Sequence, residues 1–232
     1  MAHRASRLLT FGVPGLLVAA LPLGLRLGPV RMRAAVTEDH LVEWLQVGLL
    51  AGSAVLLLRC WKTVRAIEDR RVDARTYALL ALGTLFVALE EISWGQRILG
   101  FETPHGLSHA NEQGEFNLHN YAWFHIVRNW LPLGFATFGS LCAWCAWRRP
   151  ADAPSTACRR LLPGREMLFS LVACLAVSVW LLVLYLTALR HEGDWRVGRV
   201  VAEWAELMVA YVLFLYAWLQ AVRMEATDKS RS

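Results

Sequence analysis

Long apolar runs alternate with short polar segments along the whole chain. Six of these runs approach the roughly 20 residues that an α-helix needs to cross a hydrocarbon core of about 30 Å. The predicted spans are residues 8–27, 41–60, 77–96, 130–147, 167–189 and 200–221. None of them shows the alternation over about ten residues that is typical of a barrel strand. The pattern therefore predicts one all-α transmembrane domain, residues 1–232, with about six helices.

The distribution of positive charge predicts how this domain is oriented. Of the 24 Lys and Arg residues, 16 lie in the first tail, the second and fourth loops and the last tail, and 8 lie in the alternate segments. Positive residues accumulate on the cytoplasmic side of multi-pass proteins. We therefore expect both termini in the cytoplasm, and we expect the third loop, residues 98–129, to face outward.

Composition and net charge refine the choice of partner. The chain is 56% hydrophobic and carries a net charge of +5. In a soluble protein such a charge would be typical of nucleic-acid binding. Here the basic residues flank the apolar spans, where they orient the chain and contact lipid headgroups. The sequence therefore predicts membrane lipid, and not nucleic acid, as the partner.

Five carboxylates lie within or at the ends of the predicted spans. A charged side chain inside a span costs about 2.5–3.5 kcal/mol on insertion scales, so a chain that carries several usually turns them toward the bundle interior. All five fall near the outer ends of their helices: Glu43, Glu90, Glu91, Glu203 and Glu206. We expect the third and sixth spans to touch, so that Glu90 or Glu91 faces Glu203 or Glu206 across a shared polar pocket.

Helical spacing places several polar residues of the third span on one face. Glu90, Ser93, Trp94 and Arg97 are separated by three, four and seven residues, which brings them together if the helix continues to residue 96. Glu203 and Glu206 share a face of the sixth span in the same way.

Three kinds of site fit this inventory. With His119 of the third loop, the glutamates would suit a divalent metal in a helix bundle. Without a metal, they would suit acid/base chemistry. In a purely structural network, Arg97 or Arg128 would neutralise them.

The candidate roles divide the polar residues into two sets. We expect catalytic roles, and metal binding if a metal is present, for Glu90, Glu91, His119, Glu203 and Glu206. We expect substrate binding by Ser93, Gln96, Arg97, Asn117 and Asn120.

Two strings of residues are distinctive. Residues 90–97 read EEISWGQR, and residues 111–120 read NEQGEFNLHN. Together they resemble the signature E-E-x-S-W-G-Q-R followed by N-x-Q-G-E-x-N-L-H-N, found in an uncharacterised family of bacterial multi-pass membrane proteins. The resemblance implies that the third span and third loop form the defining site, in the inner (cytoplasmic) membrane of a bacterium.

A polar site at headgroup depth, reachable sideways from the bilayer, favours an enzyme acting on a lipid or a lipid-linked substrate. Such an enzyme would be a membrane-embedded hydrolase or transferase. A proton-coupled transporter, with the same carboxylates as relay groups, is one alternative. A non-catalytic membrane scaffold, with the outer loop as its docking surface, is another.

Overall fold

The computed structural model describes residues 7–27, 41–109, 111, 114–118, 121, 124–149, 156–191 and 196–229. These residues are helical apart from connecting segments and one isolated bridge between Asn111 and Tyr121. The expected all-α class is confirmed. The elements are η1 Leu8–Gly12, α2 Val13–Leu27, α4 Leu41–Val64, η2 Glu68–Arg70, α5 Arg71–Glu91, η3 Ser93–Gly95, α6 Gln96–Leu99, α7 His105–Ser108, α8 Phe124–Arg148, α9 Ala157–Leu161, η4 Arg165–Met167, α10 Leu168–His191 and α11 Arg196–Lys229.

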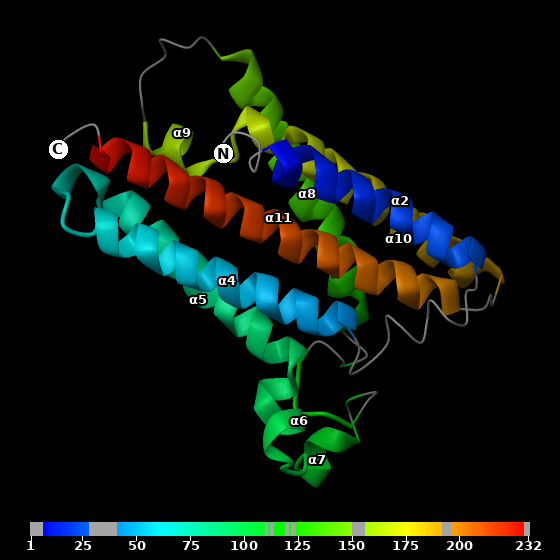
Figure 1. Cartoon of the computed structure of the whole chain (residues 1–232). Helices are drawn as coiled ribbons and strands as arrows, with labels where there is room; N and C mark the ends of the chain where they lie inside the picture. Colours follow the sequence, from blue (N-terminus) through cyan, green and yellow to red (C-terminus); the bar gives the residue numbers. More distant parts are fainter. Residues whose placement is uncertain are drawn as a thin grey trace.

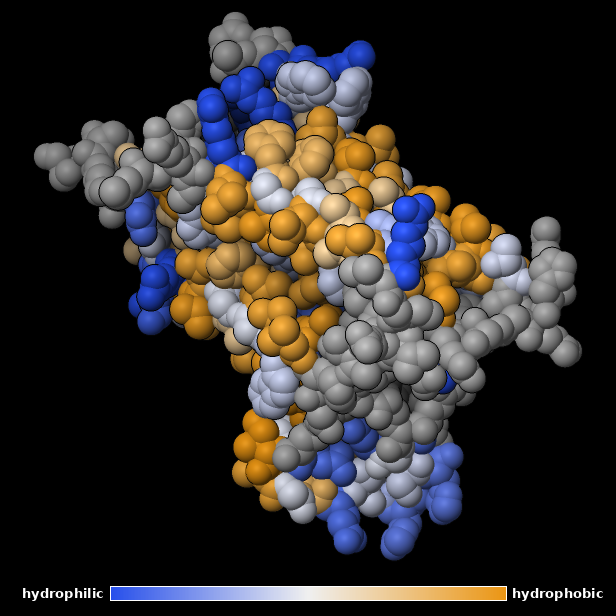
Figure 2. Space-filling view, turned by 45° about the vertical axis from the view of Figure 1, so that its right-hand side comes forward, coloured by the Kyte–Doolittle hydropathy of each residue, from blue (hydrophilic) through white to orange (hydrophobic). Residues whose placement is uncertain are grey.

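Within the described residues, five stretches are long and apolar enough to cross a membrane. They are Leu8–Arg26, Leu41–Val64, Glu68–Glu91, Arg159–Thr187 and Val197–Ala226. Figure 2 shows the corresponding hydrophobic band across the middle of the molecule, with hydrophilic side chains toward its two ends. The chain therefore has the helices of a multi-pass membrane protein. The 25-residue helix α8 covers the predicted span 130–147 but is not one of the five, so a total of six spans remains a prediction.

Helix α11 runs through the centre of the bundle (Figure 1). Of its spanning window, 72% is buried inside the protein, against 39% or less for the other four spans. Residues Val201, Ala205 and Met208 are buried in the main apolar core. Small and medium apolar side chains allow α2, α4 and α10 to pack around α11.

The first and last helices run in opposite directions along each other. Tyr211 donates its hydroxyl hydrogen to the carbonyl of Leu9, and Trp204 Nε1 donates to the carbonyl of Leu17 at 2.9 Å. The start of η1 consequently points toward the end of the bundle at which α11 finishes, although Leu9 lies level with Tyr211, 18 residues before the end of α11 (Figure 1). This arrangement supports placing both termini on one side of the membrane, and the cytoplasmic assignment of that side remains a prediction.

Two predicted boundaries are wrong. The third span was expected to reach residue 96, but α5 ends at Glu91, where the backbone turns left-handed. The fourth span was expected to begin at residue 130. Instead, α8 begins at Phe124 and contains Pro132 within one continuous helix. Proline removes one backbone hydrogen bond, and transmembrane helices tolerate this loss where neighbouring groups compensate for it.

The shared end of the termini yields a topological prediction. An alkaline phosphatase fused after the C-terminus should be inactive, because that enzyme matures only outside the cytoplasm. The same reporter inserted after Pro104, at the opposite end of the bundle, should be active. Activity at the C-terminus and none after Pro104 would reverse the orientation.

Candidate functional site

The site begins where α5 stops. Ser93, Trp94 and Gly95 have φ angles of 48°, 56° and 81°, so three successive residues are left-handed. Glycine adopts this conformation freely, whereas a residue with a Cβ is strained by about 1–3 kcal/mol. Sequence reasoning expected Glu90, Ser93, Trp94 and Arg97 on one helical face. That expectation is wrong because the helix ends before Ser93.

Ser93 lies at the centre of a buried hydrogen-bonded cluster. Its Oγ donates to Oε2 of Glu115 at 2.6 Å and accepts from Nδ2 of Asn117 at 3.0 Å. The same Asn117 nitrogen donates to Oε2 of Glu115 at 3.0 Å. Ser93 is fully buried, so its hydroxyl serves these two partners rather than solvent.

Glu90 forms the second attachment between α5 and the loop. Nε1 of Trp94 donates to its Oε1 at 2.5 Å, and the backbone N–H of Leu118 donates to its Oε2 at 2.6 Å. Hydrogen bonds to a charged group contribute about 1.5–3 kcal/mol each. The bonds to Glu90 and Glu115 are therefore large enough to offset the strain at Ser93 and Trp94.

Two amide side chains complete the attachment. Gln96 Oε1 accepts from the backbone N–H of Phe116 at 2.7 Å, and its Nε2 donates to Thr103 Oγ1 at 2.8 Å. Asn111 Nδ2 donates to both oxygens of Asn117, the backbone one at 2.9 Å and the side-chain one at 2.8 Å. Hydrogen bonds thus join the first distinctive string, residues 90–97, to the second, residues 111–120.

The predicted roles of the joined residues stay predictions, and their observed hydrogen bonds are structural. Ser93, Gln96 and Asn117 were expected to bind substrate, and their observed bonds hold the loop to α5. His119 and Asn120 lie outside the described residues, as does the side chain of Arg97. The sequence analysis missed Asn111 and Glu115 as members of the site, although both lie within the second string.

The remaining carboxylates belong to the contact among α4, α5 and α11. Leu50, Ala88 and Ala210, one from each helix, form a small buried cluster. Tyr77 Oη on α5 donates to Gln220 Oε1 on α11 at 3.2 Å, so side chains join these antiparallel helices, while α4 packs closely against both of them. Fourteen residues, about four helical turns, separate Tyr77 from Glu91, and also Gln220 from Glu206.

Counted along the two helices from this hydrogen bond, Glu91 and Glu206 lie at about the same level of the bundle. Glu91 is buried, and Glu203 and Glu206 are half-buried. Glu43 lies half-buried on the neighbouring α4.

Gln46 of α4 lies beside these carboxylates. It is 1% exposed, and its Nε2 donates to the backbone carbonyl of Glu203 at 3.0 Å. This bond fixes the amide orientation, because the side-chain oxygen would repel that carbonyl. In the described part of the chain, Gln46 Oε1 has no hydrogen-bond partner. A buried acceptor in this state costs about 1–3 kcal/mol, unless a water or a ligand supplies the donor.

A divalent metal needs three or more suitable ligands. Among the residues that the structure describes, no three His, Cys, Asp or Glu side chains gather closely enough to hold one. The metal hypothesis therefore depends on His119, and it stays a prediction.

Comparison with known proteins adds no relative. No family model, curated protein or solved structure matches the chain. The resemblance carried by the two strings therefore remains an expectation, and the function has to be argued from the site itself.

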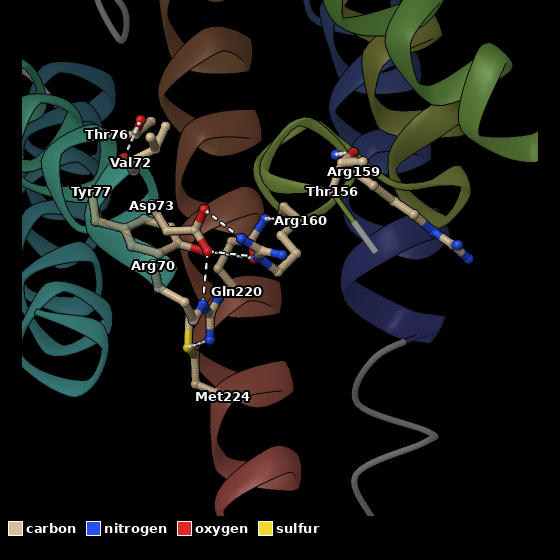
Figure 3. Close-up of polar contacts among 10 residues, drawn as sticks. All are labelled: Arg70, Val72, Asp73, Thr76, Tyr77, Thr156, Arg159, Arg160, Gln220 and Met224. Atoms are coloured by element: carbon tan, nitrogen blue, oxygen red, sulfur yellow. Dashed lines mark hydrogen bonds and ion pairs between the residues drawn. The ribbon is translucent and has the colours of Figure 1, made fainter. Parts of the chain in front are cut away.

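A second polar cluster lies at the opposite end of α5 (Figure 3), and sequence reasoning missed it. Asp73 is 0% exposed and accepts from Arg70 Nε at 2.8 Å and from Arg160 Nε at 2.7 Å. The carbonyl of Arg160 accepts from Gln220 Nε2 at 3.0 Å, and that of Leu161 accepts from Tyr216 Oη at 2.6 Å. These bonds tie the short helix α9 to α5 and α11.

The signal for this cluster was present in the sequence. Asp73 precedes Tyr77 by four residues and follows Arg70 by three, so the three share one helical face. The third predicted span begins at residue 77, so Asp73 lies outside it and was not considered with the carboxylates of the spans. Since each described polar group here has a partner, we interpret the cluster as a tether.

The Ser93 cluster predicts a local effect of mutation. Ser93→Ala removes the hydroxyl that Glu115 and Asn117 both contact, so it should loosen residues 96–118 and cost about 1–3 kcal/mol. Limited proteolysis should cut this segment faster, while the membrane spans stay intact. Ser108→Ala is the control, because the Ser108 hydroxyl donates to the carbonyl of His105 within its own short helix. Equal proteolysis of the two variants would contradict the structural role of Ser93.

The tether around Asp73 predicts an effect of mutation on the stability of the whole protein. Asp73→Asn should lower the free energy of unfolding by about 2–3 kcal/mol, somewhat below the 3–5 kcal/mol that is typical of a fully buried ion pair. The discount is needed because the Arg160 side chain is 27% exposed. Thermal unfolding of the purified protein in detergent measures the change. In the control Glu68→Gln, the lost partner Arg71 is 70% exposed, so the loss should stay below about 1 kcal/mol.

Proposed function

We propose that the protein is a membrane-embedded enzyme that acts on a lipid or a lipid-linked substrate at the membrane face where α5 ends and α11 begins. Glu91 and Glu206 are its reacting carboxylates. The observation that carries this proposal is the buried contact of Leu50, Ala88 and Ala210, because it aligns α4, α5 and α11 directly beneath the glutamates.

The register of α5 and α11 supports a two-carboxylate mechanism. The Tyr77–Gln220 hydrogen bond links the two helices, and counting along each helix from it brings Glu91 and Glu206 to about the same level at the glutamate end. Two carboxylates that come from two different helices suit an acid/base pair. One removes a proton from a nucleophile, and the other protonates a leaving group. Glu203, one turn away on α11, and His119 complete the proposed set of reacting groups.

Glu90 takes a positioning role in this proposal. Its two oxygens accept from Trp94 and from the backbone of Leu118, which attaches the loop to α5. Ser93 and Asn117 have the same task. The loop is thereby held beside the entrance to the glutamate site, and Gln46 Oε1 beneath that site supplies an acceptor for a donor group of the substrate or for a bound water.

A proton-coupled transporter is the second candidate, and one observation favours it. Buried polar side chains continue along the same helices toward the other end of the bundle: Ser53, Tyr77, Thr84 and Gln220. A transport pathway needs polar groups at such intermediate depths, whereas an enzyme confined to one face does not.

Lipid conversion by the purified protein tests the proposal. The protein is reconstituted in vesicles of total bacterial lipid, and the lipids are compared by mass spectrometry before and after incubation. Loss of general acid/base catalysis should lower the rate of product formation by about 10²- to 10⁴-fold in Glu91→Gln and in Glu206→Gln. The control is Glu225→Gln, because Glu225 is an exposed residue near the other end of α11 and should have no effect.

The alternatives give different results in the same vesicles. Full lipid conversion by both glutamine variants would overturn the acid/base roles. A transmembrane proton flux that depends on the glutamates, without any altered lipid, would favour the transporter.

A further inference from the structure

The segment after α5 forms a compact projection beyond the end of the bundle (Figure 1). This projection, the α6–α7 module, comprises the described residues between 93 and 118. Its parts are cross-linked by the bonds of Ser93, Gln96 and Asn111, so its orientation relative to α5 is fixed. The left-handed turn at Ser93–Gly95 starts α6 on a new axis.

One edge of this module is apolar although it lies outside the spanning helices. Ile98 and Leu99 are 63% and 75% exposed. Phe101 and Phe116 stand next to them as an exposed edge-to-face pair with ring centroids 6.2 Å apart. A module surrounded by water would be expected to bury such residues or to disperse them singly.

The apolar edge is continuous with the lipid-facing surface of α5. The exposed ring of Phe86 on α5 contacts the ring of Trp94 edge-to-face, with centroids 5.5 Å apart. Trp94 in turn connects α5 with α6. Tryptophan is enriched at the level where acyl chains meet headgroups, because its ring is apolar and its N–H is polar.

The module also carries exposed polar residues. Glu102, His105 and His109 are exposed. Figure 2 shows hydrophobic surface on one edge of the lower projection and hydrophilic surface toward its tip. The module is therefore amphipathic, as segments lying in the membrane interface are.

We propose that the α6–α7 module is a membrane-interface wedge whose edge, formed by Trp94, Ile98, Leu99, Phe101 and Phe116, is immersed in the lipid leaflet at that end of the bundle. Interfacial elements bury their apolar face about 5–10 Å into the boundary between headgroups and acyl chains. Glu102, His105 and His109 remain in water. The occupant of the apolar edge is lipid, because the edge continues the lipid-facing surface of α5 without interruption.

This wedge is independent of the proposed reaction, since it follows from exposure and aromatic contacts alone. If the reaction is also correct, the wedge holds the entrance to the glutamate site at headgroup depth. A lipid substrate then enters sideways from the leaflet without leaving the bilayer.

Site-directed fluorescence measures the immersion. An environment-sensitive NBD label is attached at Leu99→Cys and, as the matched control three residues away, at Glu102→Cys. Three native cysteines are replaced by serine in Cys142→Ser, Cys145→Ser and Cys158→Ser, while buried Cys60 and Cys174 are kept. The labelled parent without an added cysteine gives the background, and monomeric elution in gel filtration confirms folding.

In vesicles, the label at position 99 should be quenched by lipids that carry a doxyl group on an early acyl carbon, and it should be shielded from aqueous iodide. The label at position 102 should show the opposite pattern. Quenching of both positions by iodide alone would mean that the module lies in water and would overturn the wedge. Shielding of position 99 from both quenchers would mean that protein, such as a second copy of the chain, covers the edge, which would overturn it equally.

Discussion

The cost of leaving a polar group in hydrocarbon decides how this bundle is built. Each unsatisfied group costs several kcal/mol, and a carboxylate costs more. The buried polar side chains of α4, α5 and α11 accordingly occur where these helices pack together. Tyr77 and Gln220 bond across the contact, and Gln46 bonds to the backbone of α11. Helix α11 lies at the centre of the bundle, because only a central helix can pack against the polar side chains of several neighbouring helices.

The two ends of this three-helix contact differ in how completely their polar groups are paired. At one end, Asp73 accepts from Arg70 and Arg160, and α9 is bonded to α11 through its carbonyls. Such an end has a single arrangement of low energy. At the other end, Gln46 Oε1 is buried without a donor in the described part of the chain. Natural proteins leave few groups in this state, and they do so where a water, an ion or a ligand completes the set.

Hydropathy was sufficient to predict the helices, but it was insufficient to predict where α5 ends. An apolar run of about 20 residues has only one inexpensive conformation in lipid, so the all-α class followed from length and composition. The left-handed turn at Ser93 has no comparable local cause. It is stabilised by Glu115 and Asn117, more than 20 residues later in the chain, and a helical pattern cannot reveal such partners. Asp73 was missed for a related reason, because its partner Arg160 lies 87 residues away.

The sequence predicts a catalytic role for Glu90 and substrate binding for Ser93, because such polar residues beside a membrane are typical of reactive sites. Their hydrogen bonds argue otherwise. Both oxygens of Glu90 accept from the chain itself, and the hydroxyl of Ser93 is enclosed between two loop side chains. Groups held in this way are suited to fixing a geometry and poorly suited to exchanging protons with a substrate. The proposed function accordingly assigns reactivity one residue further along, to Glu91. The strained turn then has a structural purpose, because it redirects the chain so that Glu90 can fasten the loop to α5.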